Sequence, residues 1–440
     1  MQFRRPQLGL LRDHDFRQLF VADTISQLGT QVSQLALPLV AVVTLKATEL
    51  EVGLLVTLEF LAFLLVGLPA GAWVDRLRRR NVLVTGDLGR ALLLGSVPMA
   101  WWAGVLTIWQ LYVVALLVGV LTVFFDVAYQ SYLPHLAGRE RLVEGNAKLE
   151  VVRASSQIGG PGLAGLLIQA VTAPFAVVVD AVSFVASALF VGLIRKREAK
   201  PERAADAHLG REIAEGLRFV LGNRLLRAIA TCTGLFNLFG AATAAMTILF
   251  LVRDLGLGPG VVGLFFSVGA AGGLVGAFVV NPVVRRLGEG PAIWVSTAVT
   301  APFTLLLPAA EPGWRVWLAA AGFFVVSIGV VVYNVTQVSF RQRLTPERLL
   351  GRMNATMRFL VWGTMPVGGF LGGVLGELFG ARTTLWVAAV AQCLAFLPVF
   401  LSPLRRMREL PGPVDEPPPR EAAMAGPAAE SAAEEEPVGA

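Results

Sequence analysis

Apolar stretches of about 20 residues recur along the whole chain, separated by short polar segments. A helix of about 20 apolar residues crosses roughly 30 Å of hydrocarbon, so each stretch is long enough to span a membrane. The runs are continuous rather than alternating, which favours helices over the strands of a membrane barrel. The pattern predicts an all-α polytopic membrane protein with twelve transmembrane helices in two pseudo-symmetric halves of six.

The predicted spans divide evenly between the two halves of the chain. In the first half they cover residues 16–44, 50–73, 82–103, 109–132, 145–171 and 173–194. In the second half they cover residues 226–252, 259–281, 291–310, 315–339, 355–377 and 382–402. We therefore expect a six-helix unit at 1–194, a cytoplasmic connection at 195–225, a second unit at 226–403 and a tail at 404–440.

The two segments outside these units differ in character. The connection contains residues 212–220, whose apolar positions recur at helical spacing, and we expect this segment to lie along the membrane surface. The tail is basic and then rich in Pro, Ala and Glu, a composition that cannot bury a core. We expect the tail to be disordered.

Charge placement predicts the orientation. Only 15% of the residues are charged and 55% are hydrophobic, whereas a soluble domain carries about 25% charged residues. The net charge of +6 is compatible with nucleic-acid binding, but 28 arginines and lysines fall in segments predicted to be cytoplasmic and four fall on the opposite side. The positive-inside rule then places both termini in the cytoplasm and the chain in the inner cell membrane, with no nucleic-acid partner.

The two halves show weak self-similarity, as a duplicated chain would. Three pairs of segments match in order at offsets of 205 or 208 residues: Gly71–Val74 with Gly276–Val279, Phe125–Tyr132 with Tyr333–Phe340, and Asn146–Ala147 with Asn354–Ala355. A cluster of small residues follows in each half, at 159–165 and at 366–373. This order supports the division into two related units.

One loop resembles a signature of the major facilitator superfamily. Residues 71–80 fit the pattern G-x-x-x-D-R-x-x-R-R at the end of the second predicted span, through Gly71, Asp75, Arg76, Arg79 and Arg80. The resemblance implies the major facilitator fold and a gating role for this loop. The acid is suited to accept hydrogen bonds at a helix N-terminus, and the arginines to pair with acids or lipid phosphates. We expect a latch for the outward-open form.

A second motif indicates the direction of transport. Gly160, Pro161 and Gly165 partly match the G-P-x-x-G-G motif of exporters in this superfamily, with Leu166 in the place of the last glycine. The glycines leave a smooth helix face and the proline favours a bend, which suits helices that rock against each other.

Passages along nearly the whole chain resemble the branch that contains the enterobactin exporter and macrolide efflux proteins. These passages are Asp15–Arg17, Ser26 with Gly29, Ala36–Leu39, Phe125–Asp126 with Leu133–Pro134, Asp180–Phe184, Ile213–Phe219 and Gly351–Ala355. The resemblance implies a monomeric efflux permease driven by proton exchange. Its substrate would be a small amphipathic molecule such as a drug, macrolide or siderophore, moved by alternating access.

Ionisable residues inside membrane spans are functional candidates because burying a charge is costly. Glu59 lies near mid-membrane with no basic residue nearby in sequence, and Asp23 faces the same way if the first helix lines a cavity. These two are the proton-coupling candidates, although a structural role stays open for each. The remaining charges are predicted to form a buried network: Asp87, Arg90, Asp126, Glu150, Arg153, Asp180 and Arg358.

Rival functions remain. An importer or facilitator of a small metabolite fits the same architecture, and so does a membrane sensor or scaffold that transports nothing. An enzyme is not expected, because the three histidines are peripheral and no catalytic or metal-ligand spacing occurs. The chain contains no G-x-x-x-x-G-K loop, so we expect neither ATP-driven pumping nor a cofactor. Coupling chemistry should concentrate in the first half, with the second half serving chiefly as cavity wall.

Overall fold

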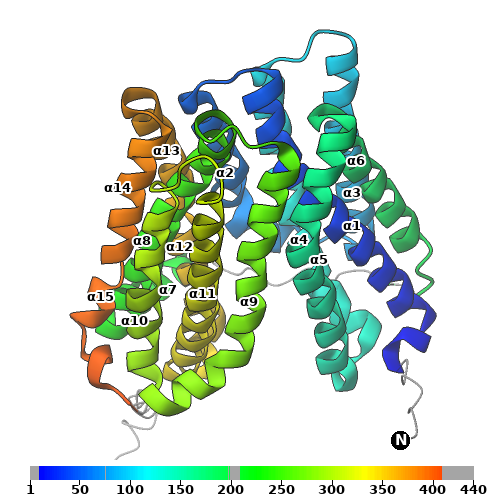
Figure 1. Cartoon of the computed structure of the whole chain (residues 1–440). Helices are drawn as coiled ribbons and strands as arrows, with labels where there is room; N and C mark the ends of the chain where they lie inside the picture. Colours follow the sequence, from blue (N-terminus) through cyan, green and yellow to red (C-terminus); the bar gives the residue numbers. More distant parts are fainter. Residues whose placement is uncertain (1–8, 75, 197, 199–208, 409–440) are drawn as a thin grey trace, which may run out of the picture.

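The computed structural model describes residues 9–74, 76–196, 198 and 209–408. These residues form a bundle of long helices, and no strand occurs among them (Figure 1). The helices of the first part are α1 (His14–Leu39), α2 (Glu49–Val74), α3 (Arg79–Trp102), α4 (Ile108–Ala137), α5 (Leu142–Val171) and α6 (Ala173–Gly192). We refer to α1–α6 as the first half.

A shorter helix, α7 (Leu209–Gly222), precedes the second half. The second half consists of α8 (Arg224–Leu249), α9 (Pro259–Leu287), α10 (Glu289–Thr300), α11 (Val316–Leu344), α12 (Leu350–Trp362), α13 (Thr364–Phe379), α14 (Ala381–Leu394) and α15 (Leu397–Phe400). Each predicted span coincides with one of these helices or with two consecutive ones. The predicted tail at 404–440 lies outside the described residues from 409 onward.

Nine helical stretches of the described chain are long and apolar enough to cross a membrane. The predicted spans outside this set are those of α1, α5 and α10. Helices α1 and α5 carry polar side chains that face an internal cavity, which lowers their mean hydropathy. Helix α10 has only 12 residues and continues as the 3₁₀ turn Ala301–Leu306.

Local backbone features repeat between the halves, as the sequence similarity suggests. A π-helical turn extends α1 at Val40–Thr44, and another extends α8 at Phe250–Asp254. The residues that follow, Lys46 and Gly256, both have positive φ, of 54° and 66°. A left-handed conformation is uncommon for a residue with a side chain, so its recurrence at matching positions shows that the chain path itself is repeated.

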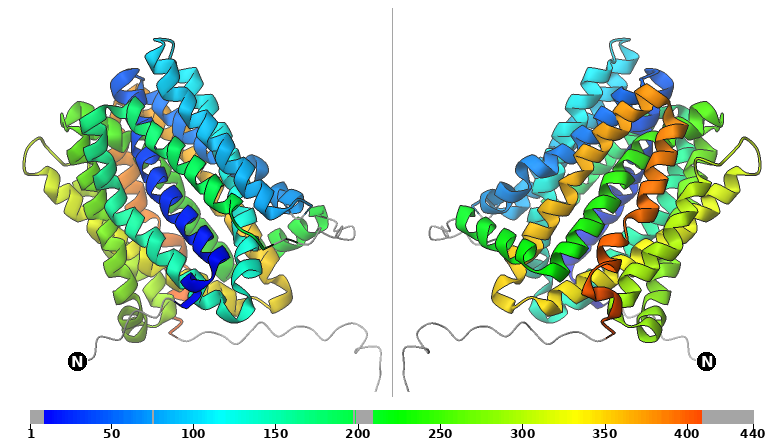
Figure 2. Two further views of the ribbon diagram at one scale, coloured as in Figure 1. Left: turned by 90° about the vertical axis from the view of Figure 1, so that its right-hand side faces the viewer. Right: turned by 90° about the vertical axis from the view of Figure 1, so that its left-hand side faces the viewer.

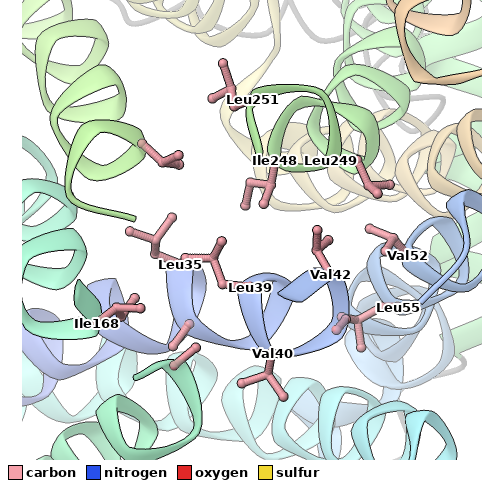
Figure 3. Packing of buried hydrophobic residues seen from close by; sticks show 14 of the residues in the cluster. Leu35, Leu39, Val40, Val42, Val52, Leu55, Ile168, Ile248, Leu249 and Leu251 are labelled. Atoms are coloured by element: carbon pink, nitrogen blue, oxygen red, sulfur yellow. The ribbon is translucent and has the colours of Figure 1, made fainter. Parts of the chain in front are cut away.

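Buried apolar side chains form three clusters, whose placement describes the shape of the molecule. One cluster joins both halves, with Leu39 and Val52 of the first half packed near Ile248 and Leu249 of α8 (Figure 3). The second lies wholly in the first half, around Phe16 and Tyr132, and the third lies in the second half and includes Phe340. The halves therefore share a core at one end only.

The two halves diverge toward the other end. Figure 1 shows α1–α6 and α8–α15 in contact near the top and splayed apart toward the bottom, where the chain begins. We call this splayed end the arginine-rich face, because it carries Arg76, Arg79, Arg195 and Arg286.

Helix α7 lies across the side of the bundle near the arginine-rich face (Figure 2). Its Glu215 forms ion pairs with Arg348, at 3.6 Å, and with Arg352 at the start of α12. A Cβ on Gly216 would lie 3.0 Å from the backbone oxygen of Arg352, so α7 packs directly on α12. Placement of this amphipathic segment along a membrane surface stays a prediction.

Candidate functional site

A large cavity lies between the halves. Its volume is about 1280 Å³, and its walls come from α1, α2, α3, α4 and α5 on one side and α8, α9, α11 and α12 on the other. Small-molecule sites in proteins have volumes of about 300–1,000 Å³, so a drug-sized molecule fits with water around it.

Two glycine contacts close the cavity at the end away from the arginine-rich face. A Cβ on Gly165 of α5 would lie 2.9 Å from the Cα of Gly263 on α9. A Cβ on Gly373 of α13 would lie 2.9 Å from the Cα of Gly53 on α2. Only a residue without a side chain permits such an approach of two backbones. Of the predicted glycine face of α5, Gly165 thus lies at the interface between the halves.

Other α5 motif residues make different contacts. The backbone N–H of Gly162 donates a hydrogen bond of 2.8 Å to the Ser267 hydroxyl of α9, which links the two halves. Gly160 faces α1, where a Cβ would collide with Gln31, while Gly159 has open space around it. The Pro161 carbonyl lies against Gly263.

A polar tie reinforces the closed end. Arg253, in the π-helical turn after α8, donates a hydrogen bond of 2.6 Å to the carbonyl of Ala47 and lies 3.7 Å from the Glu49 carboxylate. On the neighbouring pair of helices, the Leu50 backbone N–H donates to Glu377 at 3.3 Å. Sequence reasoning treated Arg253 only as a loop charge. Glu49, which follows the matching turn of the first half, was the signal in the sequence that could have indicated a partner for Arg253.

The predicted gating loop lies at the open end. Asp75 lies outside the described residues, so its role as an acceptor stays a prediction. Arg79 lies 3.4 Å from the carboxylate of Glu198, just after α6, and Arg80 donates to the carbonyl of Gly192. Neither contact reaches the second half, and Arg76 is exposed. A Cβ on Gly71 would meet nothing within 4 Å.

Carboxylates tie the chain ends of the first half together at this face. The Asp15 carboxylate accepts hydrogen bonds from the backbone N–H groups of Arg195, at 2.8 Å, and Lys196, at 3.0 Å. Partial burial raises the pKa of Asp15, but these bonds and the neighbouring His14 outweigh burial and hold that pKa below its usual value.

Glu144 fixes the 3₁₀ turn before α1 in the same way. Its carboxylate accepts a 2.6 Å hydrogen bond from the backbone N–H of Leu10 and a 3.2 Å bond from Arg141. The bond from Leu10 is the main cause of a lowered pKa for Glu144, and Arg141 and Lys148 add to it. Both ties depend on an ionised carboxylate.

The two cavity walls differ in chemistry. Polar side chains of α1 face the cavity at helical spacing, and they include Gln27, Gln31 and Gln34, a pattern that sequence reasoning missed although its spacing is readable. The second-half wall is mostly apolar and aromatic. Of the seven Asp, Glu, Arg and Lys side chains that line the cavity in the described part of the chain, six come from the first half, and Arg358 is the seventh.

Glu59 and Asp23, the coupling candidates, both line this cavity. Glu59 lies ten residues into α2, which places it about 15 Å from the closed end of that helix. Within the described chain its carboxylate has neither a hydrogen-bond donor nor an ion-pair partner. Asp23 differs, because it faces Gln27 and Tyr129 and lies within electrostatic range of Arg153.

The prediction of one buried charge network is wrong for part of its members. Asp87, Arg90 and Asp180 are buried, with exposed fractions of 0%, 4% and 1%, and Asp87 and Arg90 form an ion pair at 2.5 Å. The side chains of Glu150 and Arg153 are instead 70% and 60% exposed and pair with each other at 3.9 Å. They and Asp126 face the open cavity, because that side of α4 and α5 is turned toward solvent.

Arg90 and Arg358 both lie against aromatic rings and within electrostatic range of Asp126. The Arg90 guanidinium lies 4.2 Å from the ring centroids of Phe125 and of Phe184 and also borders the cavity. Arg358 extends from α12 toward the first half, 4.7 Å from the ring centroid of Phe63, and lies within electrostatic range of Asp126. Asp126 and Arg358 both line a smaller recess of about 270 Å³.

Comparisons with known proteins agree with this geometry. The family model described as Major Facilitator Superfamily matches residues 19–369. The multidrug efflux pump Tap of Mycolicibacterium fortuitum is 30% identical over 375 residues, which cover 82% of this chain and 89% of Tap. The enterobactin exporter EntS of Salmonella choleraesuis is 24% identical, over 92% of this chain and 96% of EntS.

Solved structures show the same fold. The inward-facing structure of a bacterial homologue of the iron transporter ferroportin aligns with a TM-score of 0.71 at 18% identity, over 89% of this chain and 99% of that one. An outward-facing structure of a bacterial ferroportin homologue aligns with a TM-score of 0.57, over 88% and 98% of the two chains. The family match and the identity to Tap show that this chain belongs to the Major Facilitator Superfamily, whose members are transporters and not enzymes.

Proposed function

We propose that the chain is a secondary transporter that exports an amphipathic small molecule by alternating access. The observation that carries the proposal is the one-sided cavity of about 1280 Å³, closed at one end by contacts between the halves and open at the other. A cavity between two rocking halves is what alternating access requires. The splayed end, where each half has its own core, corresponds to one of the two states of alternating access, the state open at the arginine-rich face.

The proposal includes an orientation. The chain would be a multi-pass protein of the inner membrane with twelve spans and both termini in the cytoplasm. By the positive-inside rule, the arginine-rich face then lies on the cytoplasmic side. The state described here is then inward-open. The protein would act as a monomer built of two units, at 1–194 and 226–403. The contacts of Gly165 and Gly373 between these units would form the outer barrier, which closes the cavity on the external side.

Two observations support transport out of the cytoplasm: the described activities of the relatives, and the position of the motif in α5. Tap is described as an efflux pump and EntS as an exporter, and both align with more than four-fifths of this chain. Gly165 and Gly263 bring α5 and α9 together at the outer barrier, so the partial exporter motif lies where the halves must separate. Substrate would enter from the cytoplasm and leave on the other side.

Proton exchange is the proposed driving force, with Glu59 as the principal carrier and Asp23 as the second. Glu59 is suited to this role because it reaches the cavity and lacks a counter-ion within the described chain. A carboxylate in this setting can release its proton when the cavity faces the cytoplasm and regain it when the cavity faces outward. The paired acids of the cavity, such as Glu150, are less suited.

The gating loop would act in the opposite state. In the inward-open form Arg79 and Arg80 contact the end of α6. When the halves close at the arginine-rich face, Asp75 would meet a helix N-terminus of the second half and latch the outward-open form. The latch would be one-sided, since Val280 and Asn281 occupy the matching positions of the second half.

A substrate panel tests the proposed function. Accumulation of drugs, macrolides and siderophores is measured in cells that express the chain and in cells that express the Gly165→Leu variant. Lower accumulation of at least one compound in the first cells, abolished by dissipating the proton gradient, is expected. Higher accumulation of a compound in the expressing cells would indicate import, and unchanged accumulation across the panel would contradict transport of these classes.

A further inference from the structure

Two seams between the halves meet at the outer barrier, one between α2 and α13 and the other between α5 and α9. The glycine contact of one seam repeats in the other, since Gly53 meets Gly373 and Gly263 meets Gly165. In each seam the start of one helix lies beside the last turns of a helix from the other half. The side chains next to these glycines differ between the seams.

At the α2–α13 seam a carboxylate of the second half lies at a helix N-terminus of the first half. The backbone N–H of Leu50, the second residue of α2, donates a hydrogen bond of 3.3 Å to Glu377 in the last turn of α13. The first N–H groups of a helix have no acceptor within that helix. Thr48 and Glu51 satisfy each other's N–H groups as a capping box, with bonds of 2.8 and 3.3 Å. Leu50 instead takes its acceptor from the opposite half.

The surroundings of Glu377 favour its charge only while the halves are in contact. The C-terminal end of a helix carries partial negative charge, so α13 itself disfavours a carboxylate in its last turn, whereas a helix N-terminus stabilises an anion. The start of α2 is close, because a Cβ on Gly376 would lie 2.8 Å from the Cβ of Glu49. The carboxylate of Glu49 is itself paired with Arg253 at 3.7 Å.

The α5–α9 seam has a neutral side chain at the matching place. A Cβ on Gly260, the second residue of α9, would collide with Oε1 of Gln169 in the last turn of α5. Gly260 follows Leu50 by 210 residues and Glu377 follows Gln169 by 208, the offsets that also relate the glycines of the two seams. The repeat therefore places a side-chain oxygen at a helix N-terminus in both seams, with a charge in one of them.

We propose that Glu377 is a charged latch of the outer barrier, which stabilises the α2–α13 seam more than Gln169 stabilises the α5–α9 seam. The proposal rests on the proposed alternating access. The carboxylate and the N-terminus of α2 separate when the barrier opens, so Glu377 favours the inward-open state. It is the external counterpart of the latch expected at Asp75, which belongs to the first half and would favour the outward-open state.

Moving the charge between the matching positions tests the latch. Gln34 lines the cavity, so Gln34→Cys in a chain whose native cysteines are serine is labelled from outside by a membrane-impermeant thiol reagent only when the outer barrier opens. Glu377→Gln keeps the acceptor oxygen, removes the charge and should accelerate labelling about two- to fivefold. Gln169→Glu adds a carboxylate at the N-terminus of α9 and should slow labelling by a similar factor. The double variant should label within about twofold of the reference protein.

Two controls separate charge from shape. Glu311→Gln removes an exposed carboxylate that pairs with Arg315 inside the second half, and its labelling rate should equal that of the reference protein. Raising the salt concentration from about 10 mM to about 1 M shortens the screening length from about 30 Å to about 3 Å. The difference between Glu377→Gln and the reference protein should therefore shrink in high salt. Gel filtration establishes that each variant is folded.

Failure of the latch is distinguishable from failure of the proposed function. Unchanged or slower labelling in Glu377→Gln, or faster labelling in Gln169→Glu, would overturn the latch and leave alternating access intact, because the reference protein still opens outward. Absence of external labelling in a reference protein that is labelled from the cytoplasmic side would contradict alternating access, and the latch with it.

Discussion

Among the described residues, the first half of the chain supplies Asp23, Glu59, Arg90, Asp126, Glu150 and Arg153 to the cavity, and the second half supplies one charged side chain, Arg358. The backbone differs far less. Both halves carry a π-helical turn after their first helix, followed by a residue with positive φ. The repeat has kept the chain path and changed the chemistry. A duplicated fold can therefore assign the polar chemistry to one wall and the apolar surface to the other.

At the outer barrier, in contrast, the two halves contribute equivalent contacts. Gly165 meets Gly263 and Gly373 meets Gly53, so each contact joins one helix of each half. Gly53 and Gly263 are 210 residues apart, and Gly165 and Gly373 are 208 apart, close to the offsets of the sequence repeat. Rocking would use both halves equally, while the proposed coupling would use mainly the first.

The largest predicted effect comes from the two glycine contacts. Gly165→Leu and Gly373→Leu should each reduce transport at least tenfold, because the new side chain cannot fit where a Cβ already lies 2.9 Å from a Cα. Overpacking of this kind costs about 1–3 kcal/mol or more and should force the outer barrier open. Transport of a compound from the panel measures the effect.

Gly159→Leu is the matched control, since a Cβ there would meet nothing within 4 Å. Its transport should stay within about twofold of the unmodified protein, as for an unhindered surface site. A severe loss at Gly165 with normal transport for Gly373→Leu would contradict the symmetric role of the two contacts.

A smaller effect is expected from the polar tie at the outer barrier. Arg253→Ala removes the hydrogen bond to Ala47 and the ion pair with Glu49. The side chains of the pair are 33% and 27% exposed, so the loss should be about 1 kcal/mol, a several-fold shift toward the outward-open state. Labelling of Gln34→Cys by a membrane-impermeant thiol reagent from outside, with both native cysteines replaced by serine, should accelerate accordingly.

Arg315→Ala is the control for that shift. Arg315 pairs with Glu311 four residues away in the second half and has no part in the barrier. Unchanged labelling in Arg253→Ala, or equal acceleration in both variants, would show that the tie does not hold the halves together.

The smallest effect is a pH-dependent difference in stability within the first half. The pKa of Asp15 is lowered in the folded protein from the usual value of 3.8, so its contribution is complete above pH 3.8 and disappears as pH falls through the lower folded value. Asp15→Asn should cost about 1–3 kcal/mol at pH 7, because the bonds to the backbone of Arg195 and Lys196 lose a charged acceptor. Thermal unfolding at pH 7 and at pH 3 measures the difference, and a gap that persists undiminished at the lower pH would contradict this account.

Continuous apolar runs located the helices well, because membrane length and backbone hydrogen bonding leave few alternatives. The glycine cluster at 159–165 was identified from sequence, but its partner Gly263 was not. Which residue lies opposite Gly165 depends on how α5 crosses α9, and neither helix encodes that alone. The same holds for Arg253, whose acceptor at Ala47 is a backbone carbonyl and leaves no mark in the sequence.

The charge predictions were weakest on how deeply each charged side chain is buried and on which side of its helix it lies. Glu150 and Arg153 were expected to be buried because they follow the start of a predicted span. They are exposed because the face of α5 that carries them is turned toward the open cavity rather than toward packed protein. Periodicity alone cannot separate these two environments. The isolation of Glu59 from basic residues in sequence did correspond to a carboxylate without an ion-pair partner among the described residues.

The central claim is that proton coupling depends on Glu59 in the first half. The measurement that tests it most directly is proton counterflow in liposomes, driven by a gradient of a compound that the panel shows to be exported. We predict that Glu59→Gln abolishes this counterflow, while Ser327→Ala, a change in the second-half wall, leaves it within about twofold. Undiminished counterflow in folded Glu59→Gln protein would contradict the claim.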